Sequence, residues 1–532
     1  MPPIVSSSRR RFLQQAAVAL AAQTPVARAF ARQPSPPYAL TRSAPFAREL
    51  LIPPVMGGTL DATGVRHYHL DMAAGAQHLV ADLLTPTWGY NGDYLGPTIR
   101  IPRGRPVHIR LRNGLHQSTT THWHGAHVPG NMDGGPELLI GAGHYYDYHY
   151  TLRQPAATLW YHPHPDRRTG PHIYAGLAGM LWVDDGVDAS LRLPHTYGVD
   201  DIPLIIQDRR LLADGRLAYM THPHDVMGMK GNHILVNGRE QPYWNAPAQW
   251  VRLRILNASN ARVYNIGCAD RRPFAVVASD AGLLEHGVPV RQILLAPAER
   301  VEILVDLRRD RGRSVVLQSD SRQVVPSLSA NPADSDHLDR SVFPLLELRV
   351  GAARGTPGVL PARLVTVPPL IAHGATRHFV LRVKTMHRAL KSVRHMKSPR
   401  SRSRLLGPGG MNMGTGGMDM FSINHEYMRM SVINVAVTRG QTEVWYVTND
   451  SPMAHPFHYH GTSFQVMARN GKPPPDTERG WKDTVLVRRG ETVKMIAPFH
   501  EPAGRELPFM YHCHILEHED NGMMGQFTVT EV

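Results

Sequence analysis

The chain has 532 residues, 42% of them hydrophobic, and its 58 Lys/Arg against 44 Asp/Glu give a formal net charge of +14. This length predicts about three domains of roughly 100–200 residues each. The sequence has two cysteines, Cys268 and Cys513, which excludes a fold built on a disulfide framework. No nucleic-acid recognition motif accompanies the basic excess, so we expect no nucleic-acid partner.

The first 31 residues have the pattern of a bacterial twin-arginine export signal. Residues 8–13 read SRRRFL, an apolar run follows at 16–22, and Ala-x-Ala cleavage sites occur at 27–29 and 29–31. The run is too short to span a bilayer and no later stretch is long and apolar enough, so we do not expect a membrane-embedded protein. The pattern predicts an exported, periplasmic protein; the alternative is a disordered basic tail.

A strand-like segment occurs three times, at 107–113, 251–257 and 443–449. Each segment alternates apolar and polar residues and ends in Asn, a pattern that predicts a half-buried β-strand entering a turn. Nine and eleven residues after the first and third Asn stand histidines, whereas the middle repeat has Ile266 and Cys268 at these offsets. We therefore expect no metal-binding pair in the middle repeat and a buried apolar role for Cys268.

The 31 histidines would give roughly two His-x-His pairs by chance, and the sequence has six. The pairs 67/69 and 222/224 lack the flanking pattern of the others, and we interpret them as surface histidines. The remaining pairs stand in repeated contexts, since YHPH at 161–164 aligns with YHCH at 511–514. The candidate metal-binding pairs are His122 and His124, His162 and His164, His458 and His460, and His512 and His514.

The most specific motif lies near the C-terminus, where Cys513 stands between two histidines. His518 and Met523 follow it, and His455 opens an HPFHYHG motif upstream. One thiolate, two imidazoles and a weak axial thioether are the blue-copper ligand set. Neighbouring side chains of an extended segment point to opposite faces, so Cys513 can bind one metal while the flanking histidines reach others.

On these residues the chain resembles the multicopper oxidases, and most closely the periplasmic copper-efflux type of cuprous oxidase. The resemblance rests on HCH-x₃-H-x₄-M from residue 512 and HPxHxHG from residue 455, and covers nearly all of the chain after the signal. Short strands punctuated by Gly and Pro also indicate an all-β chain of sandwiches. The resemblance implies three cupredoxin-like Greek-key β-sandwich domains, at 45–190, 195–350 and 375–532.

The resemblance further implies four copper ions: one type 1, one type 2 and two type 3. Its type 1 ligands correspond to His455, Cys513, His518 and, as the axial ligand, Met523. Its trinuclear ligands correspond to His122 and His458 for type 2, to His124, His162 and His514 for one type 3 ion, and to His164, His460 and His512 for the other. Reduction of dioxygen to water takes four electrons and four protons, so one-electron donors require a store of this size. Electrons would enter at Cys513 and leave through its two histidine neighbours.

Two acids match the proton carriers of the family. Asp133, in the DGGP stretch after the first histidine pair, matches the acid beside the type 2 copper. Glu519, next to His518, matches the acid that relays protons to the trinuclear centre. The alternatives are a turn-forming Asp and a salt-bridged Glu.

A basic insert at 384–420 separates the middle repeat from the last copper motifs. Residues 382–404 contain nine Lys/Arg and no acid, and apolar residues recur at helical spacing from Lys384 until Ser398. Met411, Met413, Met418 and Met420 follow in a Gly-rich tract. Thioethers favour Cu(I), and the resembling cuprous oxidases have a methionine-rich helix and loop over the type 1 site. The alternative is a solvated linker with scattered methionines.

One departure from the cuprous oxidases affects the expected substrate-copper site. They have Asp four residues before the first type 1 histidine, where this chain has Ser451. Met453 is kept and Asp450 is displaced by one position, so a site using Met453, Asp450 and Asp419 remains a hypothesis.

The sequence leaves three functions to compare. The first is an oxidase of Cu(I) in copper tolerance, with O₂ as the acceptor. The second is a laccase-like oxidase of phenols or aromatic amines. The third is a non-catalytic envelope protein, because exported cell-division proteins share this architecture without copper; these lose the ligands that this chain retains. We expect a monomer.

Overall fold

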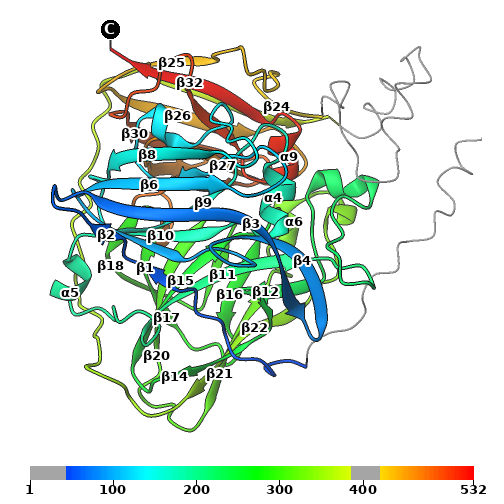
Figure 1. Ribbon diagram of the computed structural model, residues 1–532, viewed down its shortest axis with the longest axis vertical. Coiled ribbons are helices and arrows are strands. Elements are labelled where there is room, and N and C mark those ends of the chain that lie inside the picture. The colour runs from blue at the N-terminus through cyan, green and yellow to red at the C-terminus, as the bar shows by residue number, and fades with distance from the viewer. Residues whose placement is uncertain (1–43, 385–419, 532) are drawn as a thin grey trace, which may run out of the picture.

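The structure is a computed structural model that describes residues 44–384 and 420–531. Strands dominate, and the few helices are short (Figure 1), so the expectation of an all-β chain is confirmed. The strands form six sheets, which lie as three consecutive pairs along the chain. The export signal, the helix expected from Lys384 to Ser398 and three of the four tract methionines lie outside the described residues.

The first pair of sheets contains β1 to β10, in the orders β1-β5-β10-β9-β7 and β2-β3-β6-β8, with β4 paired to β3. The strands are β1 Val55–Met56, β2 Thr59–Leu60, β3 Arg66–Val80, β4 Leu83–Tyr90, β5 Thr98–Pro102, β6 Pro106–Asn113, β7 His122–His124, β8 Tyr145–Thr151, β9 Ala157–His162 and β10 Gly179–Asp184.

The second pair contains β11 to β22, in the orders β13-β12-β11-β15-β20-β17-β18 and β14-β22-β21-β16-β19. The strands are β11 Asp201–Arg209, β12 His233–Val236, β13 Arg239–Glu240, β14 Tyr243–Ala246, β15 Trp250–Asn257, β16 Tyr264–Cys268, β17 Phe274–Ser279, β18 Gly282–Val290, β19 Gln292–Leu295, β20 Arg300–Asp306, β21 Ser314–Asp320 and β22 Val342–Val350.

The third pair contains β23 to β32, in the orders β24-β23-β26-β30-β28 and β25-β32-β31-β27-β29. The strands are β23 Thr376–Val383, β24 Phe421–Ile423, β25 Val435–Thr438, β26 Thr442–Asn449, β27 His455–Tyr459, β28 Gln465–Arg469, β29 Thr484–Val487, β30 Thr492–Pro498, β31 Phe509–Cys513 and β32 Met524–Thr530.

Short helices connect the strands and are placed around the seams between sandwiches. They are α3 Gly130–Asp133, α4 Thr169–Ala175, α5 Val187–Ser190, η1 Pro223–Met227, α6 Val325–Leu328, η2 Pro332–Asp334, η3 Asp476–Glu478 and α9 Leu516–Asp520. Within the described ranges no helix is long and apolar enough to cross a membrane.

The three repeated segments are equivalent strands: β6, β15 and β26. The Asn that ends each strand uses its side chain in the same way. Its amide donates to two backbone carbonyls, for example those of Gln117 and Ile140 for Asn113, and its oxygen accepts the amide two residues later. A short polar side chain that satisfies its own turn explains why Asn recurs at this position.

The middle repeat differs from the prediction of a half-buried strand. β15 is buried on both faces, because its polar face lies against the first sandwich. There Arg252 and Arg254 share the carboxylate of Glu302, and Arg254 lies over the ring of Trp182 at 4.0 Å. Sequence alternation identified the strand but not the neighbouring domain that covers its polar side.

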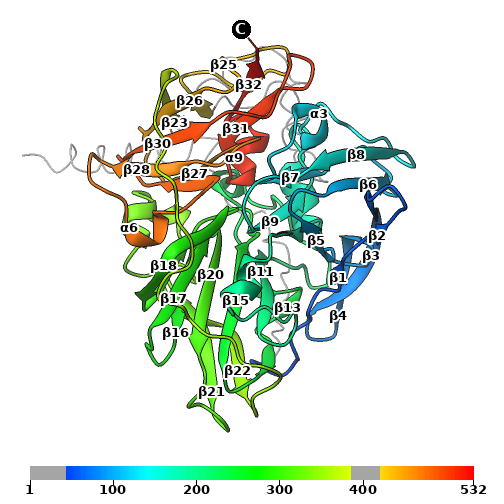
Figure 2. The same cartoon turned by 90° about the vertical axis from the view of Figure 1, so that its left-hand side faces the viewer.

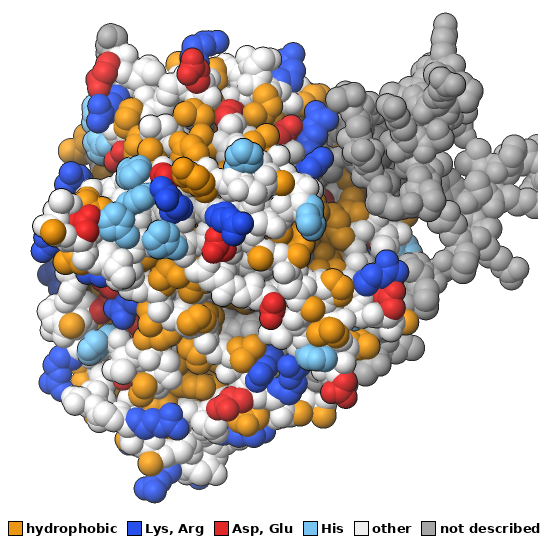
Figure 3. Space-filling model, viewed as in Figure 1, with side chains coloured by type: hydrophobic (Ala, Val, Ile, Leu, Met, Phe, Trp, Pro, Cys, Tyr) orange, Lys and Arg blue, Asp and Glu red, His pale blue; other side chains and the backbone are white. Residues whose placement is uncertain are grey.

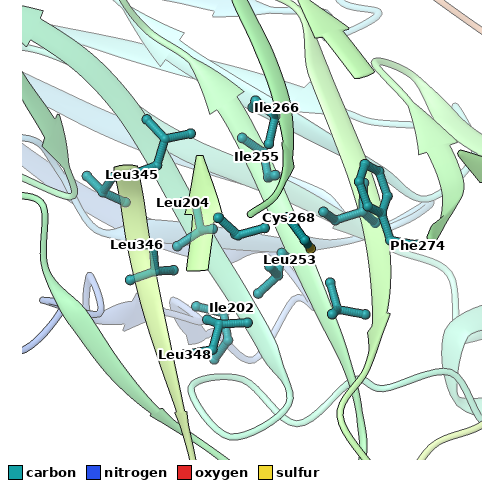
Figure 4. Packing of buried hydrophobic residues seen from close by; sticks show 14 of the residues in the cluster. Ile202, Leu204, Leu253, Ile255, Ile266, Cys268, Phe274, Leu345, Leu346 and Leu348 are labelled. Atoms are coloured by element: carbon teal, nitrogen blue, oxygen red, sulfur yellow. The ribbon is translucent and has the colours of Figure 1, made fainter. Parts of the chain in front are cut away.

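Each sandwich has its own apolar core. Figure 4 shows the core of the second sandwich, where Cys268 packs among aliphatic side chains such as Leu253 and Ile255. Cys268 is buried and unpaired, and burial raises the pKa of its thiol to about 12. Its predicted role as a buried apolar residue is confirmed.

The three sandwiches pack around a common centre. In Figure 2 the second sandwich lies below, and the first and third meet above it, with β7 and β9 facing β27, β31 and α9. At the start of the described chain, Phe46 and Leu50 hydrogen-bond to Gln241 and Tyr243 of the second sandwich. The segment that precedes β1 in the sequence therefore packs against the second sandwich.

Candidate metal centre

The four predicted histidine pairs meet between the first and third sandwiches. β7 provides His122 and pairs with β9, so that His122 lies opposite His162. β27 and β31 repeat this arrangement in the third sandwich, with His458 opposite His512. All eight imidazoles are buried. Adjacent antiparallel strands thus place histidine pairs, distant in sequence, side by side.

The imidazoles form three groups in which one ring nitrogen of each member lies within 4.8 Å of the others. The groups are His122, His124 and His458; His124, His162 and His514; and His164, His460 and His512. The last two coincide with the two expected type 3 sets, and the first contains both expected type 2 ligands. The family assignment of these residues is therefore geometrically feasible.

One nitrogen of most rings is held by the protein, which fixes the tautomer. Nδ1–H of His122 donates to the carbonyl of Asp133 at 2.8 Å, and Nδ1–H of His458 donates to the carbonyl of Asp483 at 2.7 Å. Nδ1–H of His162 donates to the carbonyl of Pro163 at 2.8 Å. Each ring therefore presents an unprotonated Nε2, which is the form that binds a metal.

The free nitrogens point at one another. Nε2 of His512 lies 3.3 Å from Nε2 of His164 and 3.4 Å from Nε2 of His460. Nε2 of His122, Nε2 of His458 and both ring nitrogens of His514 are buried without a hydrogen-bond partner. Burial lowers the pKa of His164 to about 4, so the ring is neutral at physiological pH. Converging, neutral and unsatisfied buried imidazoles fit metal ions, because such nitrogens are otherwise costly.

A second buried cluster lies beside this one and contains the thiol. Nδ1 of His455 is 3.4 Å from Sγ of Cys513, Nδ1 of His518 is 3.6 Å from it, and the two nitrogens are 3.2 Å apart. Met523 is buried in the same core. Burial raises the pKa of the Cys513 thiol above its usual range, so a bound metal would have to supply the positive charge that deprotonates it.

The surroundings of this cluster orient its two rings. The hydroxyl of Ser451 lies 2.7 Å from Nε2 of His455. Nε2 of His518 lies 3.3 Å from the carbonyl of Met227, on η1 of the second sandwich, and Phe421 stacks on the same ring. Both rings therefore turn Nδ1 towards Cys513. The chain has Ser451 where the cuprous oxidases have Asp, and this hydroxyl holds the ring in place.

Both predicted acids contact the histidine groups. Oδ2 of Asp133 lies 2.7 Å from Nδ1 of His460 and 3.4 Å from Nδ1 of His122. Glu519 lies 3.1 Å from Nδ1 of His512 and 3.6 Å from Nδ1 of His164. Each carboxylate thus spans two imidazoles on the side away from the converging nitrogens, where a proton can pass without displacing a ligand.

Sequence reasoning missed an ion pair beneath the cluster. Asp483 lies 3.1 Å from Nε2 of His124, and Arg300 of β20 donates to its carboxylate from both Nη1 and Nη2. All three side chains are buried. The aspartate turns Nδ1 of His124 towards Nε2 of His162, 3.3 Å away. No local sequence motif marks Arg300 or Asp483. The two residues meet only because the fold places β20 against the third sandwich.

The residues of the hypothetical substrate-copper site are placed in different surroundings. The carboxylate of Asp450 is exposed and pairs with Arg382 at 2.9 Å. Met453 lines a pocket between the second and third sandwiches, and Met420 is buried in the core of the third. Met411, Met413, Met418 and Asp419 lie outside the described residues.

That pocket lies next to the thiol-containing cluster. Its lining includes Ala454 and Pro456, which flank His455 in the sequence, and Ile515, which is two residues after Cys513. Met227 and Met453 also line the pocket. The second sandwich closes it with Val325, Leu328, Asp334 and Asp339. A small molecule in this pocket would therefore lie beside the chain neighbours of His455.

Comparison with known proteins agrees with this geometry. Residues 74–188 and 405–532 match family profiles described as multicopper oxidase. A multicopper oxidase of Staphylococcus haemolyticus is 33% identical over 486 residues, which covers 91% of this chain and 92% of the relative. The cell division protein FtsP of Xenorhabdus nematophila is also 33% identical, over 525 residues and 99% of each chain. The chain belongs to the multicopper oxidase family, whose cofactor is copper.

A solved structure extends the comparison. The laccase-like multicopper oxidase CueO of an Ochrobactrum species is 35% identical, with a TM-score of 0.77, and the match covers 90% of this chain and 100% of that one. The prediction of three cupredoxin-like sandwiches is confirmed by this likeness.

Proposed function

We propose that the protein couples one-electron oxidation of a donor at a type 1 copper to reduction of O₂ to water at three further copper ions. The observation that carries this proposal is the set of eight buried imidazoles whose ring nitrogens converge in three groups. Copper, when bound, supplies one-electron redox chemistry and a place for O₂. The remaining tasks belong to side chains of this chain.

The backbone of β31 connects the two clusters. Cys513 belongs to the thiol cluster, whereas His512 and His514 belong to two different imidazole groups. The neighbours in sequence therefore give a covalent path through a single peptide unit between the donor and acceptor sites. Asp133 and Glu519 lie next to the acceptor site, where they can relay protons without taking a ligand position.

Replacing Glu519 by Gln should slow turnover by roughly 100-fold, because a positioned acid contributes on the order of 100-fold or more. The amide keeps the shape of the carboxylate but cannot take up and release the proton beside His512. Oxygen uptake and copper content should be measured together, with the exposed Glu531→Gln as control. Copper should stay fully bound; unchanged turnover would contradict the role of Glu519.

For the donor we propose Cu(I). The pocket next to His455 contains the thioethers of Met227 and Met453, and sulfur ligands of this kind favour Cu(I). Asp334 and Asp339 also line the pocket, but they pair with His224, Lys230 and Arg262, so the case for Cu(I) rests on the thioethers. This assignment implies a role in copper tolerance.

The alternative donor is a phenol or an aromatic amine. The Ochrobactrum relative, laccase-like and described with activity towards lignin model compounds, favours this alternative. The placement of Asp450 with Arg382, rather than with the pocket, also weakens a dedicated copper site at this position.

Oxygen uptake by the copper-loaded protein, with Cu(I) or a simple phenol as donor, distinguishes the two. One variant should lack 386–418, which spares Lys384 and the buried Met420, joined by a backbone hydrogen bond. A second should carry Met453→Leu, with the exposed Met430→Leu as its matched control. Lower Cu(I) turnover with retained phenol turnover in both variants supports Cu(I). Good phenol turnover, with neither donor affected, supports the laccase alternative.

The relation to FtsP makes a non-catalytic envelope protein the third candidate. Sequence identity does not separate the two classes, since both relatives are 33% identical. The retained ligand set favours the oxidase, and the copper content of the purified protein tests it directly. We also propose export by the twin-arginine route to the periplasm; Arg9→Lys with Arg10→Lys should then retain the protein in the cytoplasm on cell fractionation.

A further inference from the structure

Three histidines far apart in the sequence form a row on the outer face of the first sandwich. His67 of β3 lies opposite His108 of β6, and His108 lies opposite His149 of β8. Figure 3 shows histidine side chains gathered over these strands. None of the three belongs to the buried clusters described above, and of the three only His67 belongs to a His-x-His pair, which we interpreted as surface histidines.

Two of these rings face each other through the same kind of atom. Nδ1 of His67 lies 3.1 Å from Nδ1 of His108. Nε2 of His67 lies 2.7 Å from Oδ2 of Asp61, and Nε2 of His108 lies 2.7 Å from Oδ1 of Asp147. A carboxylate can only accept, so each Nε2 carries the hydrogen. In the neutral rings both Nδ1 atoms are then bare lone pairs, and something positive must lie between them.

This arrangement is that of a metal site with its outer partners in place. Histidines that bind metals commonly donate their other N–H to a carboxylate, which fixes the ring and raises its basicity. Two nitrogens bound to one ion at about 2.0–2.1 Å are roughly 3 Å apart. The observed 3.1 Å between the Nδ1 atoms agrees with that separation.

The partners are themselves fixed and ionised. Asp61 accepts from the backbone N–H groups of Thr63 and Val65. The hydrogen bond from His67 is the largest cause that lowers the pKa of Asp61. Arg110 binds the carboxylate of Asp147 with Nε and Nη2, and lowers its pKa to about 2. Negative charge therefore stands behind both imidazoles at neutral pH.

The pair is accessible to an ion from solution. The side chains of His67 and His108 are 31% and 16% exposed, which leaves room for water to complete the coordination. His149 stacks on His108 with ring centroids 4.3 Å apart and limits the rotation of that ring. The site is thus rigid on one side and open on the other.

We propose that His67 and His108 bind one divalent transition-metal ion through Nδ1, separately from the copper centres. Imidazole ligands suit Cu²⁺, Ni²⁺ and Zn²⁺, and Cu²⁺ binds most tightly in the general affinity order. A single proton shared between the two rings is the arrangement that competes with a metal ion.

The test is a calorimetric titration of the fully copper-loaded protein with Cu²⁺ and, separately, Zn²⁺. We expect one additional equivalent to bind, with Cu²⁺ tighter than Zn²⁺. His67→Gln and His108→Gln should each remove this binding, and Asp61→Asn should weaken it by about 10–100-fold. His69→Gln is the matched control, since His69 is an exposed histidine on the same strand and face.

Blue absorption and oxygen uptake should be unchanged in all four variants, which would show that each is folded and that the centres are intact. Absence of the additional equivalent would overturn the proposal in favour of the shared proton. Equal binding by the wild type and both ligand variants would overturn it as well, because the ion would then bind elsewhere.

Discussion

Cys513→Ser should remove the blue absorption of the protein and lower its oxygen uptake by at least about 100-fold. Loss of a residue that only supports a metal ligand costs up to about 100-fold, and Cys513 would itself be a ligand. A hydroxyl is a hard ligand and remains protonated, whereas the thiolate binds copper and begins the covalent path to His512 and His514. The side chain of residue 513 does not orient the eight imidazoles of the other cluster. His512 lies near the backbone carbonyl of residue 513, and serine retains that carbonyl. Copper analysis should therefore show the loss of one ion per chain, not of all.

Cys268→Ala is the matched control, because it removes the other buried thiol from a core without histidines. Its blue absorption and oxygen uptake should equal those of the wild type, although a small cavity will cost some stability. Retention of the blue absorption in Cys513→Ser would contradict the assignment of this residue. Retained turnover would show that donors can bypass β31.

The sequence predicted the eight imidazoles because their geometry is local. Two residues at i and i+2 of a strand share a face whatever the fold does, and the repeated offsets from Asn113 and Asn449 placed the pairs on equivalent strands. Part of the thiol cluster was also close in sequence, since Cys513 ends β31 and His518 follows five residues later in α9. Strand geometry therefore placed the two histidines of each pair together, whereas the grouping of the pairs around metal ions came from the family resemblance.

The residues that sequence reasoning missed meet through contacts between segments far apart in the sequence. Arg300 and Asp483 lie 183 positions apart, and nothing near either one distinguishes it from an ordinary surface charge. His67 and His108 likewise meet only through the parallel pairing of β3 with β6. The prediction that β15 is half-buried was wrong for a similar reason. The alternation of apolar and polar residues describes one sheet and not the neighbouring domain that covers it.

Arg300→Met should lower the free energy of unfolding by about 3–5 kcal/mol, because it leaves the carboxylate of Asp483 buried without its partner. The Arg300 guanidinium also links the three sandwiches, which a simple ion pair would not do. It donates to backbone carbonyls of Thr158 in the first sandwich and of Asp280 in the second, while it binds Asp483 in the third. Loss of this one side chain therefore loosens the contact of all three sandwiches.

Copper binding should weaken together with stability, since Asp483 orients His124 and its main-chain carbonyl holds His458. Denaturant unfolding and chelator competition on the same samples measure the two effects. Arg308→Met is the matched control: Arg308 pairs with Asp306 on the surface, where such pairs contribute about 1 kcal/mol or less. If Arg300→Met lowered stability and copper affinity no more than Arg308→Met, the metal ions and strands alone would hold the centre. A larger loss of stability and copper affinity in Arg300→Met, present also in the copper-free protein for stability, would support a structural role of the middle sandwich. That sandwich would then hold together a site whose resident copper ligands all come from its two neighbours.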